Sequence, residues 1–295
     1  ILAEEQREGY RAKKLCFNLT GYSRVNAYVL IPDGEGPFPA VVLLHDHGGH
    51  YTIGKEKMIR PFGVDKAVLD DADAWAANCY GGQYAGDYLA AHGYVVISVD
   101  ALYWGGRGRK EGADGSKYAD NAGNFMMLGR SLSAFINYED MYTTDYLATL
   151  PEVDPKRIAC MGFSMGGYRA WMLSALSDKI QVGAAICWMT TTDCQFSWEY
   201  GRERGGFANM LPGIRRYLDY PHIASIACPK PMLFLNGEHD KLFPPIGVRA
   251  AFAEMHEVWE SRSAGDKLVT ELWDMPHDCG KKVQAKILDF LNKWL

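Results

Sequence analysis

Along the chain, short apolar runs alternate with longer segments of helical spacing, and this pattern limits the possible folds more than any other. Strands are expected over 11–20, 24–31, 40–44, 94–99, 157–161, 182–188, 231–235 and 268–273, and helices over 84–91, 125–150, 165–176, 247–260 and 281–295. Strands that alternate with helices form a mostly parallel sheet with helices on both faces. The sequence therefore predicts an α/β fold, and its 295 residues fit a single domain, 1–295.

Three long segments interrupt this alternation, at about 47–82, 101–124 and 190–225. Each follows the C-terminal end of an expected strand and is rich in glycine, aromatic and charged residues. Because open α/β sheets bind ligands at those strand ends, we expect the three insertions to form the walls of a site rather than separate domains.

Composition excludes several classes of protein. The chain has 31 basic and 36 acidic residues, a net charge of -5 and no basic block, which argues against a nucleic-acid partner. No apolar run approaches the roughly 18 residues of a membrane span. Its seven cysteines are scattered without a CxxC pair, which argues against a zinc knuckle or a disulfide framework. We expect no cofactor and no metal.

The sharpest local motif is Gly162-Phe163-Ser164-Met165-Gly166-Gly167, which lies between an expected strand and an expected helix. A nucleophile elbow has this arrangement, because the serine occupies a strained strand-to-helix turn and the glycines let neighbouring backbone pass without a Cβ clash. The motif therefore predicts Ser164 as a nucleophile.

A serine nucleophile needs a base, and the base needs an acid to fix its tautomer. His277 follows the last expected strand and is the candidate base, while Asp240 lies in the loop after the strand 231–235 and is the candidate acid. The order Ser164, Asp240, His277 is that of α/β-hydrolases. Asp193, which follows the preceding strand, and Glu238 remain alternatives for the acid.

An oxyanion hole is the other part that this chemistry requires. One donor is the backbone N–H after the nucleophile, here Met165. The second is expected in the loop after the strand 40–44, where we favour His47 over its neighbours Asp46 and Gly48. The three histidines of this loop could instead be metal ligands together with Asp46.

The insertions carry side chains that could bind substrate. Aromatic rings stack on sugars, although aromatics in long loops often pack locally. Guanidinium groups match carboxylates, as on a uronan, although these arginines could equally form salt bridges within the loops. The candidate substrate-binding residues are Trp104, Arg107, Trp188, Trp198, Arg202 and Arg204, with Arg109 a further candidate for the cationic rim.

Several stretches carry a family resemblance. They are Val42 to Gly49, Asp100 to Gly105, Leu128 to Leu132, Glu152 to Ile158 running into the elbow, Gly237 to Asp240, and Pro276-His277. On these residues the chain resembles the α/β-hydrolase superfamily and, within it, dienelactone-hydrolase-like and acetyl-xylan-esterase-like bacterial esterases. The resemblance implies the α/β-hydrolase fold over roughly residues 24–290. Dienelactone hydrolases carry cysteine where this chain has Ser164, which disfavours their substrate.

Taken together, motif and resemblance predict a serine carboxylic-ester hydrolase that removes acetyl or methyl esters from plant-type polysaccharide or oligosaccharide, including a methyl-esterified uronan such as pectin. A serine peptidase or acyltransferase would use the same residues, and a non-catalytic binding member would have a broken triad. The resemblance also implies export to the periplasm or the cell exterior, although the segment that begins at Ile1 does not read as a signal peptide. The sequence does not indicate an oligomeric state.

Overall fold

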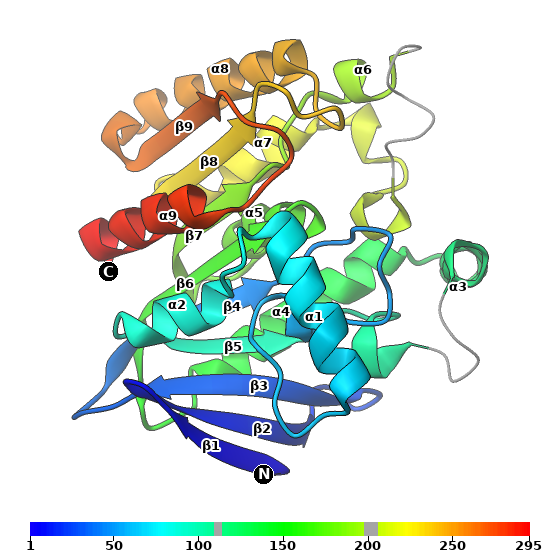
Figure 1. Ribbon diagram of the computed structural model, residues 1–295. Helices are drawn as coiled ribbons and strands as arrows, with labels where there is room; N and C mark the ends of the chain where they lie inside the picture. Colours follow the sequence, from blue (N-terminus) through cyan, green and yellow to red (C-terminus); the bar gives the residue numbers. More distant parts are fainter. Residues whose placement is uncertain (109–113, 198–205) are drawn as a thin grey trace.

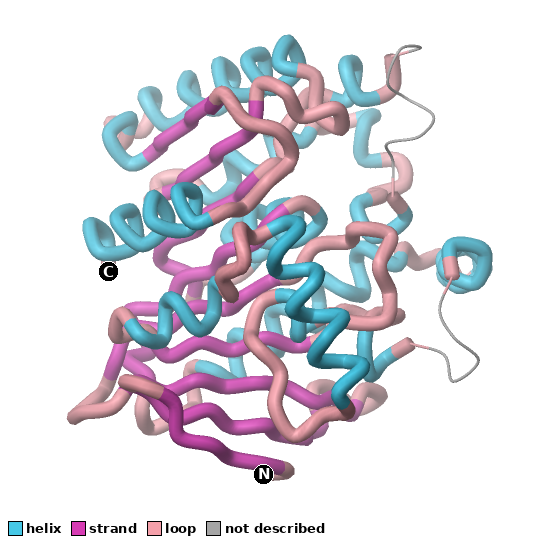
Figure 2. Tube along the Cα trace, in the orientation of Figure 1, coloured by secondary structure: helices cyan, strands magenta, loops and turns pink. Residues whose placement is uncertain are grey.

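The computed structural model describes residues 1–108, 114–197 and 206–295, and its centre is one large sheet (Figures 1 and 2). The strands of the described residues are β1 (Ala3–Arg7), β2 (Tyr10–Asn18), β3 (Arg24–Pro32), β4 (Phe38–Leu44), β5 (Val95–Val99), β6 (Val153–Phe163), β7 (Ile180–Ile186), β8 (Met232–Gly237) and β9 (Leu268–Trp273). They lie in the order β1-β2-β3-β5-β4-β6-β7-β8-β9. The strands from β5 to β9 in this order run parallel, whereas β1, β2 and β3 pair antiparallel, as do β3 and β5.

Helices cover both faces of the sheet. They are α1 (Lys66–Cys79), α2 (Ala85–Ala91), α3 (Gly115–Met127), α4 (Leu132–Leu147), α5 (Met165–Leu176), α6 (Thr192–Gln195), α7 (Tyr220–Ala224), α8 (Pro245–Ser261) and α9 (Lys281–Trp294). Strand β4 shows the two-sided core: Val42 and Leu44 pack in the cluster that contains α5 and α8, and Val41 and Leu43 in the cluster that contains α2 and α9. This two-residue period explains why the central strands appear in the sequence as unbroken apolar runs.

The expected helix over 125–150 covers α4 and only the last three residues of α3, whose first ten residues fall in the segment expected as an insertion. Gly129 has φ +67°, a left-handed conformation that ends α3. Ser131 then starts α4, because its side-chain oxygen accepts a hydrogen bond from the Ala134 N–H at 3.0 Å. The sequence reading placed the helix start at residue 125 and so missed both most of α3 and the break at Gly129.

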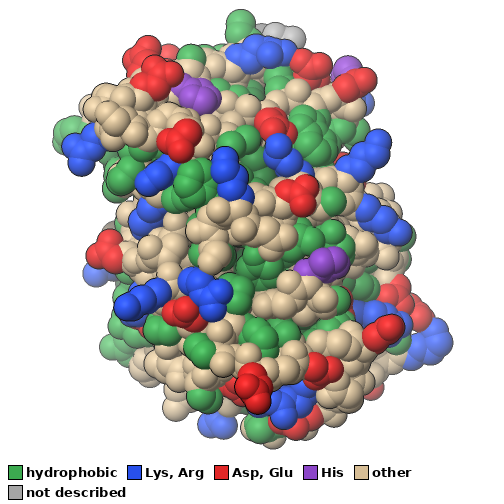
Figure 3. Space-filling view, turned by 90° about the vertical axis from the view of Figure 1, so that its left-hand side faces the viewer, with side chains coloured by type: hydrophobic (Ala, Val, Ile, Leu, Met, Phe, Trp, Pro, Cys, Tyr) green, Lys and Arg blue, Asp and Glu red, His purple; other side chains and the backbone are tan. Residues whose placement is uncertain are grey.

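The three insertions lie beyond the C-terminal ends of the parallel strands. The first contains the 3₁₀ helix η1 (Lys55–Lys57) and α1, the second contains most of α3, and the third contains α6 and α7. Within the described residues, no helix has the length and apolar character that a bilayer crossing requires. Figure 3 shows a face on which Lys and Arg side chains are interspersed with Asp and Glu.

Candidate active site

Ser164 lies at the sharp turn between β6 and α5, with φ 55° and ψ -123°. This conformation is rare for a residue with a side chain, and strain of this kind is found most often at functional sites. Its N–H donates to the Ile186 carbonyl at 2.8 Å, which fixes the turn against β7. The residue is 9% exposed and lines a cavity of about 490 Å³.

Two glycines allow this turn to form. A Cβ at Gly166 would lie 1.8 Å from the Leu44 carbonyl oxygen, and a Cβ at Gly162 would lie 2.2 Å from the Gly166 carbonyl oxygen. Backbone atoms occupy both positions, so no rotamer change could relieve the contact. The helix therefore starts directly against the end of β4.

His277 lines the same cavity as Ser164 and comes from the loop between β9 and α9. Its Nδ1 lies 2.6 Å from Oδ2 of Asp240, which follows β8 and is 3% exposed. The other Asp240 oxygen accepts from the Leu242 N–H at 2.8 Å. The ring of Phe163 lies 4.7 Å from the imidazole, centroid to centroid. With Nδ1 engaged by the carboxylate, Nε2 is the nitrogen left for proton transfer.

The alternative acids have other partners. Asp193 lies on α6, is 82% exposed at its side chain and accepts from Arg215 at 2.8 Å. Glu238 pairs with Arg249 at 2.5 Å. Of the carboxylates considered from the sequence, Asp240 is the one that the structure brings to His277.

The loop after β4 supplies a wall of the cavity through His47, Gly48 and Gly49. Both glycines have positive φ, 58° and 65°, which turns the loop tightly. Burial, reinforced by the nearby Lys57 ammonium, lowers the pKa of His47 to about 4, so its ring is neutral at neutral pH. Met165 also lines the cavity, and because it is the first residue of α5 its backbone N–H has no acceptor within the helix.

The three histidines of this loop do not converge on one point. His45 Nδ1 bonds to the Asp46 carbonyl at 2.9 Å and its Nε2 accepts from the Ala101 N–H at 3.0 Å. His47 Nδ1 accepts from the Gly49 N–H at 3.0 Å, and His50 pairs with Asp71 at 2.6 Å. Their nitrogens therefore serve separate contacts within the loop and its surroundings.

One group within the described residues has ligand atoms close enough to hold a metal: Cys187, Asp240 and His277, within 4.8 Å of one another. Burial raises the pKa of the Cys187 thiol well above its ordinary value, which opposes the thiolate form that a metal prefers. Asp240 and His277 already share a hydrogen bond. These contacts favour a hydrogen-bonded Asp240–His277 pair over a metal site.

The remaining cavity walls are mainly aromatic or apolar. Trp188, one of the residues expected to bind substrate, lies among them. The sequence did not single out Tyr118, Phe207, Asn209, Leu242 and Phe243, which also line the cavity. Tyr118 comes from α3 and Phe207 from the third insertion, so their contact depends on how the second and third insertions pack against each other.

Two expected substrate contacts are corrected by the structure. Trp104 is fully buried behind His47, with ring centroids 4.9 Å apart, and donates from Nε1 to the His47 carbonyl at 3.3 Å. Arg107 forms a two-pronged ion pair with Glu139, at 2.5 and 2.8 Å. Both side chains brace the loops instead. Trp198, Arg202, Arg204 and Arg109 lie outside the described residues.

Comparisons with known proteins identify the family of the chain. A family model described as "Abhydrolase family" matches residues 1–263. YtaP, a candidate hydrolase of Bacillus subtilis (strain 168), is 28% identical over 292 residues, which are 99% of this chain and 90% of YtaP.

Solved structures share the fold at lower identity. A candidate acetyl xylan esterase from Bacteroides fragilis NCTC 9343 has a TM-score of 0.73 and 20% identity, and the match covers 92% of this chain and 68% of that one. A glucuronoyl esterase from Solibacter usitatus has a TM-score of 0.67 and 15% identity, covering 98% and 84%. The chain therefore has the α/β-hydrolase fold and belongs to the Abhydrolase family.

Proposed function

We propose that this protein hydrolyses carboxylic esters through a serine nucleophile. One observation carries the proposal: Ser164, at a strained elbow, opens into the same cavity as His277, whose Nδ1 is held 2.6 Å from the buried Asp240 carboxylate. This is the relation of nucleophile, base and orienting acid that acyl transfer uses.

In the proposed mechanism, Ser164 Oγ attacks the ester carbonyl while His277 Nε2 takes its proton. Asp240 keeps the proton on Nδ1 and stabilises the imidazolium that forms. The backbone N–H groups of Met165 and His47 donate to the tetrahedral oxyanion. The imidazolium then protonates the leaving alcohol, and water, deprotonated by the same imidazole, releases the acid from the acyl-enzyme.

We further propose that the acyl group is small and uncharged, such as an acetyl group on a carbohydrate. The described walls of the cavity contain no lysine, arginine or carboxylate side chain, and Arg107 is occupied by Glu139. Trp188, Tyr118 and Phe207 offer aromatic surface of the kind that packs on sugar rings. An acetyl xylan esterase candidate and a glucuronoyl esterase both share the fold, so the choice of acyl group rests on the cavity walls.

The test compares ester classes and a nucleophile variant. We expect the protein to hydrolyse 4-nitrophenyl acetate and acetylated xylo-oligosaccharide faster than a methyl ester of glucuronic acid. The Ser164→Ala variant should lose about four or more orders of magnitude in kcat, because a triad that has lost one member loses the covalent route. Ser261→Ala, an exposed serine at the end of α8, is the matched control and should keep full activity.

Two results would contradict the proposal. Undiminished turnover by Ser164→Ala would remove the serine mechanism. Faster release of methanol from the uronate ester than of acetate from the oligosaccharide would overturn the assignment of the acyl group and favour a uronate esterase.

A further inference from the structure

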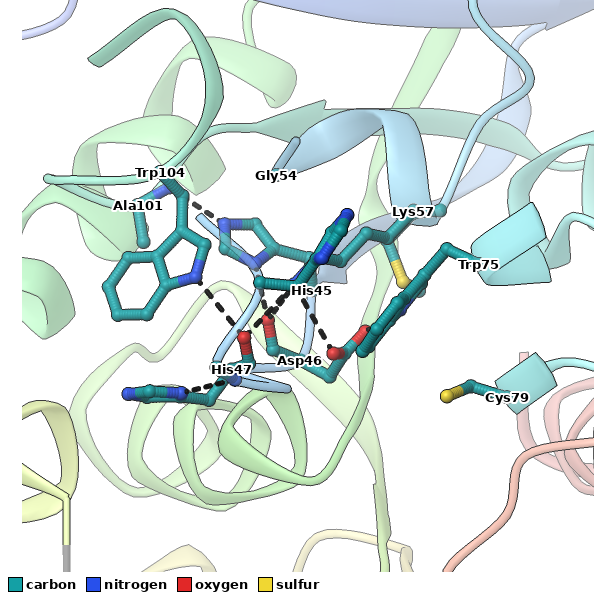
Figure 4. A network of polar contacts seen from close by, with 12 residues as sticks. His45, Asp46, His47, Gly54, Lys57, Trp75, Cys79, Ala101 and Trp104 are labelled. Atoms are coloured by element: carbon teal, nitrogen blue, oxygen red, sulfur yellow. Dashed lines mark hydrogen bonds and ion pairs between the residues drawn. The ribbon is translucent and has the colours of Figure 1, made fainter. Parts of the chain in front are cut away.

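Lys57 is a fully buried lysine whose ammonium is bound to the loop that carries His47 (Figure 4). Its Nζ donates to the Asp46 carbonyl at 3.0 Å, to the His47 carbonyl at 3.1 Å and to Asp46 Oδ1 at 3.3 Å. A lysine ammonium has three donors, and these three acceptors use all of them. Burying an ammonium group costs free energy, and two of the three hydrogen bonds of this one go to backbone carbonyls of the loop. These two contacts are therefore candidates for a functional role.

The Asp46 carboxylate compensates the Lys57 charge and is itself held by two further donors. Asp46 Oδ2 accepts from Tyr80 at 2.7 Å and from Trp75 Nε1 at 3.2 Å, and the Lys57 ammonium also lies 4.9 Å from the centre of the Trp75 ring. Burial lowers the pKa of Lys57, and the attraction of Asp46 opposes that effect. The carboxylate is therefore the partner that keeps a proton on the buried amine.

The Asp46–His47 peptide bond links this ammonium to the proposed oxyanion hole. The Asp46 carbonyl and the His47 N–H belong to one planar trans unit, so they point in opposite directions. The carbonyl accepts from Lys57 and also from His45 Nδ1, whose tautomer is fixed because Nε2 accepts from the Ala101 N–H. With the carbonyl held from two sides, the N–H is aimed away from Lys57.

We propose that Lys57 is a positioning residue for catalysis, which orients and polarises the Asp46–His47 peptide so that the His47 N–H stabilises the oxyanion. The inference rests on the proposed function. A positive charge at the carbonyl end of a peptide draws electron density from its N–H and strengthens that donor. The benefit is greatest where negative charge develops in the transition state, so it acts on kcat more than on substrate binding.

The chain supplies a matched control in the same turn of 3₁₀ helix. Lys55 is also buried, at 3% exposure, and its Nζ pairs with Glu56 at 2.6 Å and Asp100 at 2.8 Å. These partners lie outside the 45–50 loop. Lys55→Met therefore removes a buried ammonium from η1 without removing a hydrogen bond to the Asp46–His47 peptide.

The experiment measures kcat and KM for 4-nitrophenyl acetate, and the affinity for a trifluoromethyl ketone that forms a tetrahedral adduct, in wild type, Lys57→Met and Lys55→Met. Rates are normalised to the concentration of reactive serine. We expect Lys57→Met to lose roughly 10²- to 10³-fold in kcat with KM within about threefold, and to lose ketone affinity by the same factor. Lys55→Met should stay within about threefold of wild type after normalisation.

A second variant covers the case in which Lys57→Met does not fold. Lys57→Gln keeps N–H donors near the two carbonyls but not the charge, and should give a smaller loss of kcat. It should also move the infrared carbonyl stretch of the acyl-enzyme to higher wavenumber, because a weaker oxyanion hole polarises that carbonyl less.

Equal losses in the Lys55 and Lys57 variants, a loss confined to KM, or an unshifted carbonyl stretch would overturn the positioning role while leaving the proposed function intact. A wild-type enzyme without esterase activity would overturn the proposed function and this inference together.

Discussion

Asp240 and Asp193 are both engaged in ion pairs, but only Asp240 has a proposed catalytic role. Asp240 is buried against His277, whereas Asp193 is exposed and pairs with Arg215. Asp240→Asn would place an amide beside Nδ1 and favour the wrong imidazole tautomer, so kcat should fall by about 10³- to 10⁴-fold. Asp193→Asn should change kcat less than twofold, because exposed ion pairs contribute little.

Steady-state kinetics of both variants, with circular dichroism to show that each is folded, checks this prediction. A larger loss of kcat in Asp193→Asn than in Asp240→Asn would show that Asp240 is not the catalytic acid.

Residues that follow a strand in a fixed order along the chain could be predicted from the sequence. Residues whose role depends on which partner their side chain contacts could not. Ser164, Asp240 and His277 could be named because each follows a strand in a fixed order, and the structure brings the last two together. Lys57 could not, because the alternating charges of Lys55, Glu56 and Lys57 resemble a solvated turn. Arg107 was expected either to bind substrate or to form a salt bridge within its loop, and its partner Glu139 on α4 was not foreseen because it is distant in sequence.

The strand-to-helix turn at β6 and α5 is the structural element on which the site depends most. Gly166→Ala would push a Cβ to within 1.8 Å of the Leu44 carbonyl oxygen, and backbone must move to relieve it. We expect a loss of about 3 kcal/mol or more in the free energy of unfolding, with loss of activity. Gly123→Ala in α3 is the control: nothing lies within 4 Å of its Cβ, and it should be neutral or stabilise by up to about 1 kcal/mol.

Urea unfolding of the two variants measures the difference. Gly166→Ala as stable and as active as wild type would show that β4 and α5 do not approach as closely as described.

Elements with a strong apolar pattern were predicted well, and elements without one were not. The expected helix over 165–176 and strand over 268–273 coincide with α5 and β9. Helix α1 was missed because only Ala72 and Ala76 are buried on it, which leaves no apolar stripe to detect. Strand β1 was missed because it lies at the sheet edge, where polar residues are tolerated.

The topology gathers the site at the scale of the whole molecule. The parallel strands β4, β6, β8 and β9 have their C-terminal ends on the same side of the sheet. The loops that follow them, which carry His47, Ser164, Asp240 and His277, therefore meet in one region although they are far apart in the sequence. The sequence could predict this edge because the alternation of strands and helices implies it. It could not predict the cavity walls, because the insertions have no periodicity and their shape depends on how they pack against one another.

Covalent labelling with a fluorophosphonate determines whether Ser164 is the nucleophile. Attack by the serine oxygen on phosphorus displaces fluoride and leaves a stable adduct that mass spectrometry locates by peptide mapping. We predict one adduct per chain, on the peptide that contains Ser164, and none in Ser164→Ala. An unlabelled wild-type protein, or a single adduct on another residue, would contradict the account.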